Sequence, residues 1–118
     1  MAKTLTIILN RGPISSEYAD MALKTAIKAR DKGYNVNMWL HIDGVWLAQL
    51  RKEKPGDSTG NRLKEARSKG VQVKICGRCT DLRDMGKAGE TIEGMPILGL
   101  PDLITWLRSS DKVITFTG

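Results

Sequence analysis

Two cysteines, Cys76 and Cys79, stand three positions apart, and they are the only cysteines in the 118-residue chain. An alternating run of β-forming residues, 71–75, leads directly into them, and Gly70 bounds this run upstream. A helix that starts near Thr80 would place both thiols at the carboxyl end of a strand and close to a helix N-terminus. The positive end of the helix dipole stabilises a thiolate there, and the thiolate is the form of cysteine that attacks.

Several chemistries use a C-x-x-C pair. In sulfur transfer, one thiolate takes the terminal sulfur of a donor persulfide, and the second thiol releases that sulfur by closing a disulfide. Thiol–disulfide redox chemistry is the main rival, although the strand order of a thioredoxin and an obvious cis-proline are missing. The two residues can also be buried small hydrophobes. A structural zinc ion takes about four ligands, and the chain offers two cysteines and one histidine, His41, so we predict no metal and no cofactor.

Strand-type and helix-type patterns alternate along the whole chain. Strands are expected at 3–9, 35–42, 71–75, 95–98 and 111–117, and helices at 16–32, where Ser15 or Ser16 is the expected cap, at 61–69 and at 102–109, with another after Cys79 and a short helical piece at 45–50. This order predicts a three-layer α/β/α sandwich with a mainly parallel sheet of about five strands. Residues 1–118 form a single domain in this interpretation, because nothing marks a boundary.

Ligands of such sheets bind outside the carboxyl ends of the strands. The loops 10–16, 41–45 and 76–83 are therefore expected to converge around the thiols. Cys76 is the predicted reactive thiol, because the sheet fixes its backbone, and Cys79 assists it from one helical turn away. The other residues expected to line this cleft are Asn10, Arg11, His41, Asp43, Gly77 and Arg78.

Most of these cleft residues have a second, structural interpretation. His41 is either a proton shuttle or a structural histidine at a strand end. Arg78 either stabilises a thiolate or is simply solvated, and Gly77 is expected to keep the approach to Cys76 open. Asn10 and Asp43 are also residue types that turns favour for backbone reasons alone.

Residues 51–60 are polar and contain proline, glycine and serine, so we expect a mobile loop outside the core. The three tryptophans, Trp39, Trp46 and Trp106, are expected to be core residues or anchors of a subunit interface, where tryptophan is enriched.

The composition limits the class of protein. There are 19 Lys and Arg residues against 13 Asp and Glu, a net charge of +6, but the basic residues are spread along the chain and aromatic residues make up only 5%. We therefore expect a solvated basic surface and no nucleic-acid partner. Charges interrupt the apolar stretches and no signal-peptide pattern opens the chain, so no membrane association and a cytoplasmic location are expected. In that reducing compartment, paired cysteines are more often reactive than structural.

The pattern as a whole resembles the DsrE/DsrF-like family of small sulfur-relay proteins. The residues that carry this resemblance are the first strand 4–9, the helix around 22–29, the segment 42–45, the run 70–79 with Arg83 downstream, and the ending 103–107 followed by 111–116. The segment Arg83-Asp84-Met85-Gly86 departs from the Arg-Gly pair that is common at this place in the family, so the local turn is expected to differ.

The resemblance implies an α/β sandwich that assembles into homotrimers or hexamers. It also implies that Cys76 carries sulfane sulfur as a persulfide, and that Cys79 matches a second cysteine which only some members have. Donor and acceptor proteins for the sulfur would be the partners. Because many members have no demonstrated activity, the resemblance leaves open whether this chain is an enzyme, a sulfurtransferase, or a non-catalytic oligomeric protein that binds a small ligand or a partner.

Overall fold

Five strands form one sheet in the computed structural model, which describes residues 2–14, 16–87 and 89–117. The strands are β1 (Thr4–Leu9), β2 (Asn35–Leu40), β3 (Gln72–Cys76), β4 (Ile97–Leu98) and β5 (Lys112–Phe116), in the order β4-β3-β2-β1-β5. Every pair of neighbouring strands runs parallel. The predicted mainly parallel sheet of about five strands is therefore confirmed.

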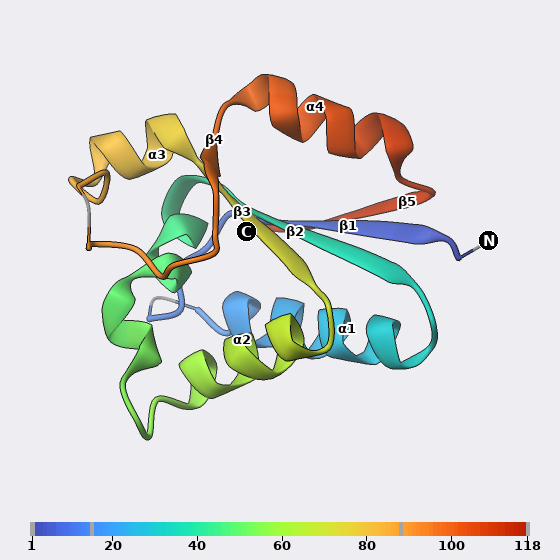
Figure 1. The fold of residues 1–118 in the computed structure, drawn as a ribbon, viewed down its shortest axis with the longest axis horizontal. Coiled ribbons are helices and arrows are strands. Elements are labelled where there is room, and N and C mark those ends of the chain that lie inside the picture. Colours follow the sequence, from blue (N-terminus) through green and yellow to red (C-terminus); the bar gives the residue numbers. More distant parts are fainter. Residues whose placement is uncertain (1, 15, 88, 118) are drawn as a thin grey trace.

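Helices cover both faces of this sheet, which confirms the predicted three-layer sandwich (Figure 1). The helices α1 (Tyr18–Asp31) and α2 (Ser58–Ser68) lie on one face, and α3 (Gly77–Leu82) and α4 (Leu100–Ser109) lie on the other. Two short 3₁₀ helices, η1 (Ile42–Ala48) and η2 (Leu50–Glu53), connect β2 to α2. None of the helices in the described part of the chain is long and apolar enough to cross a membrane.

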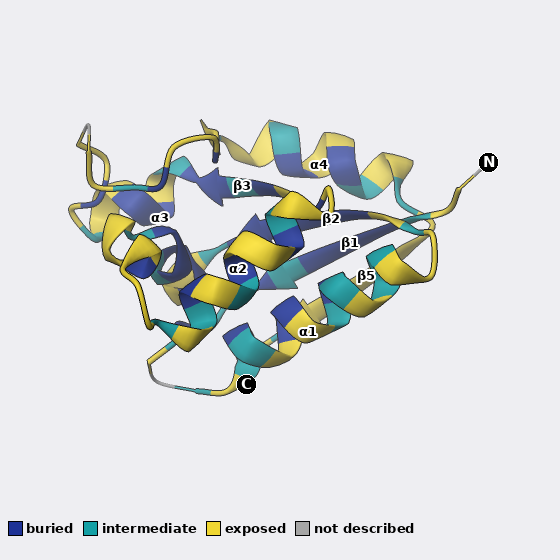
Figure 2. Cartoon of the chain, turned by 60° about the horizontal axis from the view of Figure 1, so that its bottom comes forward, coloured by how far each residue is buried: buried dark blue, intermediate teal, exposed yellow. Residues whose placement is uncertain are grey.

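The central strands are buried on both faces, as a parallel sheet between two helical layers requires (Figure 2). On the face toward α4, the fully buried ring of Trp39 meets the ring of Trp106 edge-on at a centroid distance of 6.3 Å. Trp46 is half-buried outside this pair. The prediction that tryptophans anchor the core is thus confirmed for Trp39 and Trp106.

Several element boundaries differ from those expected. The second strand ends at Leu40 rather than at residue 42, because Ile42 already opens η1. Glu17, not a serine, is the N-cap residue of α1, although Ser16 Oγ still accepts a hydrogen bond from the Tyr18 N–H. The alternative cap, Ser15, lies outside the described residues. The helix α3 starts at Gly77, three residues earlier than the start near Thr80 that was expected from the sequence.

The prediction that residues 51–60 form a loop outside the core is wrong at both ends of the segment. Lys52 lies in η2 and is only 8% exposed, and Gly60 is buried in the first turns of α2. Asp57 links the two ends: it accepts a hydrogen bond from the Gly60 N–H at 2.8 Å and pairs with Lys52 Nζ at 3.1 Å. The polar composition of the segment therefore reflects helix capping and a partly buried ion pair.

Replacing Asp57 with alanine is expected to lower the free energy of unfolding by about 1–3 kcal/mol, because it removes a helix cap and leaves Lys52 without its carboxylate. Asp57→Asn keeps a capping acceptor and should cost roughly half as much. The Gly60 N–H and Lys52 lower the pKa of Asp57. The Asp57 carboxylate therefore contributes to the free energy of unfolding at neutral pH. This contribution is lost as the pH falls below about 4 and through the lowered pKa, because the carboxylate is then protonated.

Urea unfolding at neutral and acidic pH checks this expectation. The difference in free energy of unfolding between wild type and the alanine variant should become smaller at acidic pH. A gap that stays constant with pH, or an asparagine variant as unstable as the alanine one, would contradict the assigned role of the carboxylate.

Candidate functional site

Three predicted site residues follow the last paired row of the central strands. Leu9 pairs with Leu40, and Leu40 pairs with Ile75. The next residues along these strands, Asn10, His41 and Cys76, therefore come at the same carboxyl edge of the sheet. This confirms that the loops after β1, β2 and β3 meet at one edge, as the order of the elements predicts.

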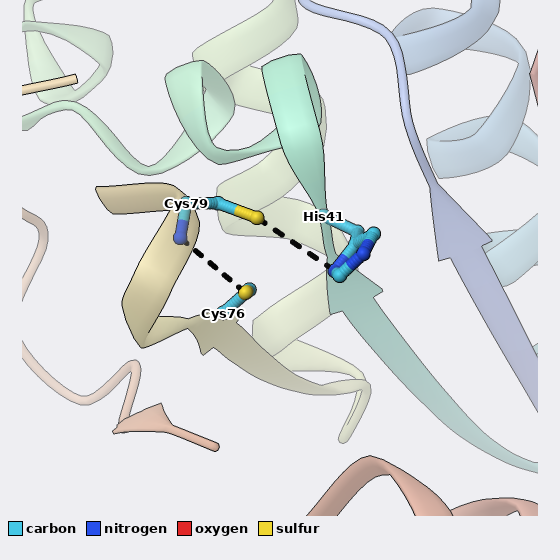
Figure 3. A group of neighbouring side chains, drawn as sticks. All are labelled: His41, Cys76 and Cys79. Carbon is cyan, nitrogen blue, oxygen red and sulfur yellow. Dashed lines mark hydrogen bonds between the residues drawn. The ribbon is translucent and has the colours of Figure 1, made fainter. Parts of the chain in front are cut away.

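Cys76 and Cys79 are joined by the turn that starts α3 (Figure 3). Cys76 is both the last residue of β3 and the N-cap residue of α3, and its Sγ accepts a hydrogen bond from the Cys79 N–H at 3.4 Å. Both residues are free cysteines, 3% and 8% exposed respectively. The sheet and the helix thus hold two thiols side by side without joining them.

His41 lies across from the second thiol (Figure 3), with its Nδ1 atom 3.8 Å from Cys79 Sγ. The indole Nε1–H of Trp39 donates to the same Nδ1 at 3.3 Å. Nδ1 must therefore be an acceptor, and this assigns the proton of the neutral ring to Nε2. Burial first, and the nearby Arg83 second, lower the pKa of His41, so the neutral ring predominates at pH 7.

The backbone at Ile42 supplies a second contact to Cys79, because its N–H donates to Cys79 Sγ at 3.1 Å. Ile42 has a φ of +50°, which a β-branched residue rarely adopts. Burial raises the pKa of Cys79, the hydrogen bond with Cys76 raises it further, and the Ile42 N–H opposes both. The strained backbone thus aims one N–H group at a buried sulfur.

Arg83 ties this backbone to the helix of the cysteines. Its guanidinium pairs with Asp43 in η1 at 2.9 Å and donates to the carbonyl oxygen of Cys79 at 3.1 Å. Asp43 was predicted as a cleft residue, and the structure places it in this bridge between η1 and α3. Asp84, in the turn where the chain departs from the family pattern, has a φ of +55°.

The other predicted cleft residues are placed as follows. Asn10 is half-buried, and its Oδ1 is buried without a hydrogen-bond partner among the residues that the structure describes. Arg11 is half-buried in the next position, and Arg78 is exposed. A side chain at Gly77 would come within 3.3 Å of the Leu98 carbonyl oxygen, so this glycine lets β4 pack against the start of α3.

Three groups that contact the site were not predicted from the sequence: the indole of Trp39, the backbone N–H of Ile42 and the guanidinium of Arg83 as a bridge. Trp39 stands two positions before His41, which continues the extended backbone directly after β2, and this alternation was the available signal. The loop 41–45, which contains Ile42, was expected near the thiols, but no sequence signal indicated that the Ile42 N–H would contact a sulfur.

Two hollows among the described residues do not contain the sulfurs, and only the smaller one adjoins the site. A cavity of about 330 Å³ adjoins it through Asp43 and is lined also by Gly12, Pro13, Ile14, Trp46, Gln49 and Arg51. A larger one of about 640 Å³ lies between α2 and the edge of β3, with Leu63, Arg67 and Val73 among its lining residues. The thiols themselves are covered, so the arrangement favours small atoms such as a single sulfur over a bulky substrate.

The chain is similar to a known protein family over nearly its whole length. Residues 3–116 match the DsrE/DsrF-like family. The chain belongs to this family. The match spans nearly all of the described elements, from β1 to β5, and so agrees with the resemblance seen in the sequence.

Relatives and solved structures agree with this membership. The chain is 34% identical to the protein YchN of Escherichia coli K12 over 116 residues, 95% of this chain and 97% of that protein. It is 34% identical to the uncharacterized protein MJ0989 of Methanocaldococcus jannaschii over 113 residues, 94% and 97% of the two chains. The crystal structure of the E. coli protein superposes with a TM-score of 0.83 at 32% identity, covering 98% of this chain and 100% of that one.

A structure of protein MTH1491 from Methanobacterium thermoautotrophicum superposes with a TM-score of 0.73 at only 10% identity, covering 97% of this chain and 99% of that one. This second likeness concerns the fold alone.

Proposed function

We propose that this member of the DsrE/DsrF-like family is a cytoplasmic sulfur-relay protein that carries sulfane sulfur as a persulfide on Cys76. The observation that supports the proposal most directly is the pair of free thiols one helical turn apart, each sulfur facing a backbone N–H group. Such N–H groups stabilise the negative charge of a thiolate or of a persulfide.

Loading needs one exchange step. The Cys76 thiolate attacks the terminal sulfur of a donor persulfide, a new S–S bond forms on Cys76, and the donor leaves as a thiolate. Delivery is the same step in reverse order: an acceptor thiolate attacks the terminal sulfur and leaves Cys76 as a thiolate. Electrons and sulfur atoms balance in each transfer, so neither step requires an oxidant.

Cys79 provides a second route for release. Its thiolate attacks Cys76 Sγ, the terminal sulfur leaves as hydrosulfide, and a Cys76–Cys79 disulfide forms, which a thiol reductant then opens. Burial raises the pKa of Cys79. His41 Nδ1 lies 3.8 Å from its sulfur and can accept the thiol proton when the Trp39 indole N–H releases that nitrogen. These contacts support the assignment of Cys79 as the assisting thiol.

A redox role is the second candidate, because the same two free thiols could cycle between dithiol and disulfide. Intact mass after incubation with a low-molecular-weight polysulfide, in buffer with a metal chelator, separates the two functions. A carrier gains one or more sulfur atoms that dithiothreitol removes. Because Cys79 can then close a disulfide with loss of two hydrogens, the mass is followed from the earliest times, and the Cys79→Ser variant, which cannot close the disulfide, should keep the added sulfur. A redox protein loses two hydrogens and gains no sulfur, and a binding protein keeps its mass.

We also propose that the protein is a homo-oligomer, a trimer or a hexamer. Leu100 and Ile104, one turn apart on α4, are 55% and 52% exposed. Apolar side chains of this size on one helix face are typical of surfaces that another chain covers. β5, at the edge of the sheet, adds Val113 and Ile114, 46% and 38% exposed.

Ile104→Glu is expected to weaken self-association at least about tenfold, because burial of one isoleucine side chain contributes about 1.5–3 kcal/mol. Light scattering over a range of concentrations measures the mass of the assembly. Ile14→Glu is the matched control, since Ile14 is 75% exposed in a loop after β1. A wild-type protein that is monomeric at every concentration would contradict the oligomer, and equal effects of the two variants would contradict the role of α4.

A further inference from the structure

The two cysteines and the one histidine of the chain converge on one point. His41 offers Nδ1, and Cys76 and Cys79 offer their sulfurs, with all three atoms within 4.8 Å of one another. They come from the residue after β2, from the end of β3 and from α3, so tertiary structure rather than sequence spacing brings them together (Figure 3). The sequence predicts no metal, because three ligands fall short of a closed structural site. Three ligands at one point are, however, what an open metal site uses.

The distances suit a tetrahedral ion after a small adjustment. With Zn–S bonds of about 2.3 Å and Zn–N bonds of about 2.0 Å, neighbouring ligand atoms in a tetrahedral site lie about 3.5–3.8 Å apart. The observed Cys79 Sγ to His41 Nδ1 distance is 3.8 Å, and no pair exceeds 4.8 Å. Rotation of the side chains, without movement of the sheet, can close the remaining gap of about 1 Å.

The surroundings of the three atoms also suit thiolate ligands. The N–H groups of Ile42 and Cys79 already donate to the sulfurs at 3.1 and 3.4 Å, and such bonds persist around metal-bound thiolates as supporting contacts. His41 is half-buried while both cysteines are buried, which leaves an approach from the histidine side. The Trp39 indole N–H competes with an ion for His41 Nδ1, so the histidine should be the weakest of the three ligands.

We infer that His41, Cys76 and Cys79 form a binding site for one thiolate-preferring divalent ion of the zinc type, with a fourth position open to water or an external thiol. Two thiolates and an imidazole select such ions over the oxygen-preferring magnesium and calcium. Because the ion and a persulfide would use the same Cys76 sulfur, occupancy by zinc excludes sulfur loading. The ion thus acts as a reversible block on the two thiols.

Titration of the reduced, chelator-treated protein with Co²⁺ and then Zn²⁺ tests this site. Cobalt should give the absorption of a tetrahedral thiolate complex, which zinc displaces at one ion per chain with a dissociation constant of about 1 μM or tighter. Cys76→Ser and Cys79→Ser should each weaken zinc binding by at least about 100-fold, and His41→Gln by about 10-fold to 100-fold. Asp81→Asn, which removes an exposed carboxylate of α3, should leave the affinity unchanged.

Each other outcome overturns the site. Binding that survives in the double serine variant would be adventitious, and a His41→Gln variant with wild-type affinity would rule out the three-ligand geometry. Thermal unfolding of each variant without metal checks that it folds. Sulfur loading is measured separately in chelator, so failure of the zinc site leaves the proposed carrier function standing, and failure of loading leaves the zinc result standing.

Discussion

Replacement of Cys76 with serine is expected to abolish sulfur loading, with a residual level below about one hundredth of wild type. The serine hydroxyl does not ionise at neutral pH and cannot hold a persulfide. Cys76 is 3% exposed and ends a strand that is paired on both sides, so a change of one atom should leave the fold intact. Intact mass after incubation with polysulfide, together with the thermal unfolding midpoint, measures both effects.

Cys79→Ser is the matched control for this variant, since it removes the neighbouring thiol of the same pair. Loading should persist, while release of hydrosulfide without an acceptor thiol should slow by about tenfold or more, because the disulfide can no longer close. If the Cys76→Ser protein loads sulfur as well as wild type, the roles are reversed or no cysteine carries sulfur.

Gly44→Ala is expected to disturb the site from a distance. A Cβ atom at position 44 would lie 2.0 Å from the carbonyl oxygen of Leu9, far inside van der Waals contact. The η1 segment must then move away from β1 and carry with it the Ile42 N–H that contacts Cys79. Overpacking of this kind costs about 1–3 kcal/mol of stability and sometimes more.

Urea unfolding should show that loss, and iodoacetamide should label Cys79 at a changed rate. Gly86→Ala is the control, because only the exposed side chain of Asp81 stands near its Cβ and can swing aside. A Gly44→Ala protein as stable as this control, with unchanged labelling, would show that the close approach of η1 to β1 is not needed.

The sequence predicts the sheet and its helices because their signals are local. The alternation of residues 35–40 and the glycines after α1 and α2, Gly33 and Gly70, with φ values of +93° and +102°, mark elements that the structure contains. β4 has only two residues, so its place beside β3 depends on tertiary contacts. The C-x-x-C pair and the strand before it could likewise be predicted from the sequence, because their signals are also local.

The remainder of the site depends on contacts between distant residues. Ile42 takes a left-handed conformation that its side chain disfavours, and no propensity predicts it. The pairing of Arg83 with Asp43 joins residues 40 positions apart. From the sequence alone, Lys52 would be predicted to be a solvated charge. In the structure, the turn before α2 places Asp57 beside it as an ion-pair partner. In each case the packing of the whole chain overrides the local preference.

Peptide mapping of the wild-type protein tests the central claim most directly. After incubation with a polysulfide in chelator, and alkylation under conditions that preserve persulfides, the peptide with Cys76 and Cys79 is fragmented between the two residues. We predict one additional sulfur atom on Cys76 in the chains trapped before Cys79 closes the disulfide, lost after treatment with dithiothreitol. An unmodified peptide, or additional sulfur only on Cys79, would contradict the assignment of Cys76 as the sulfur carrier.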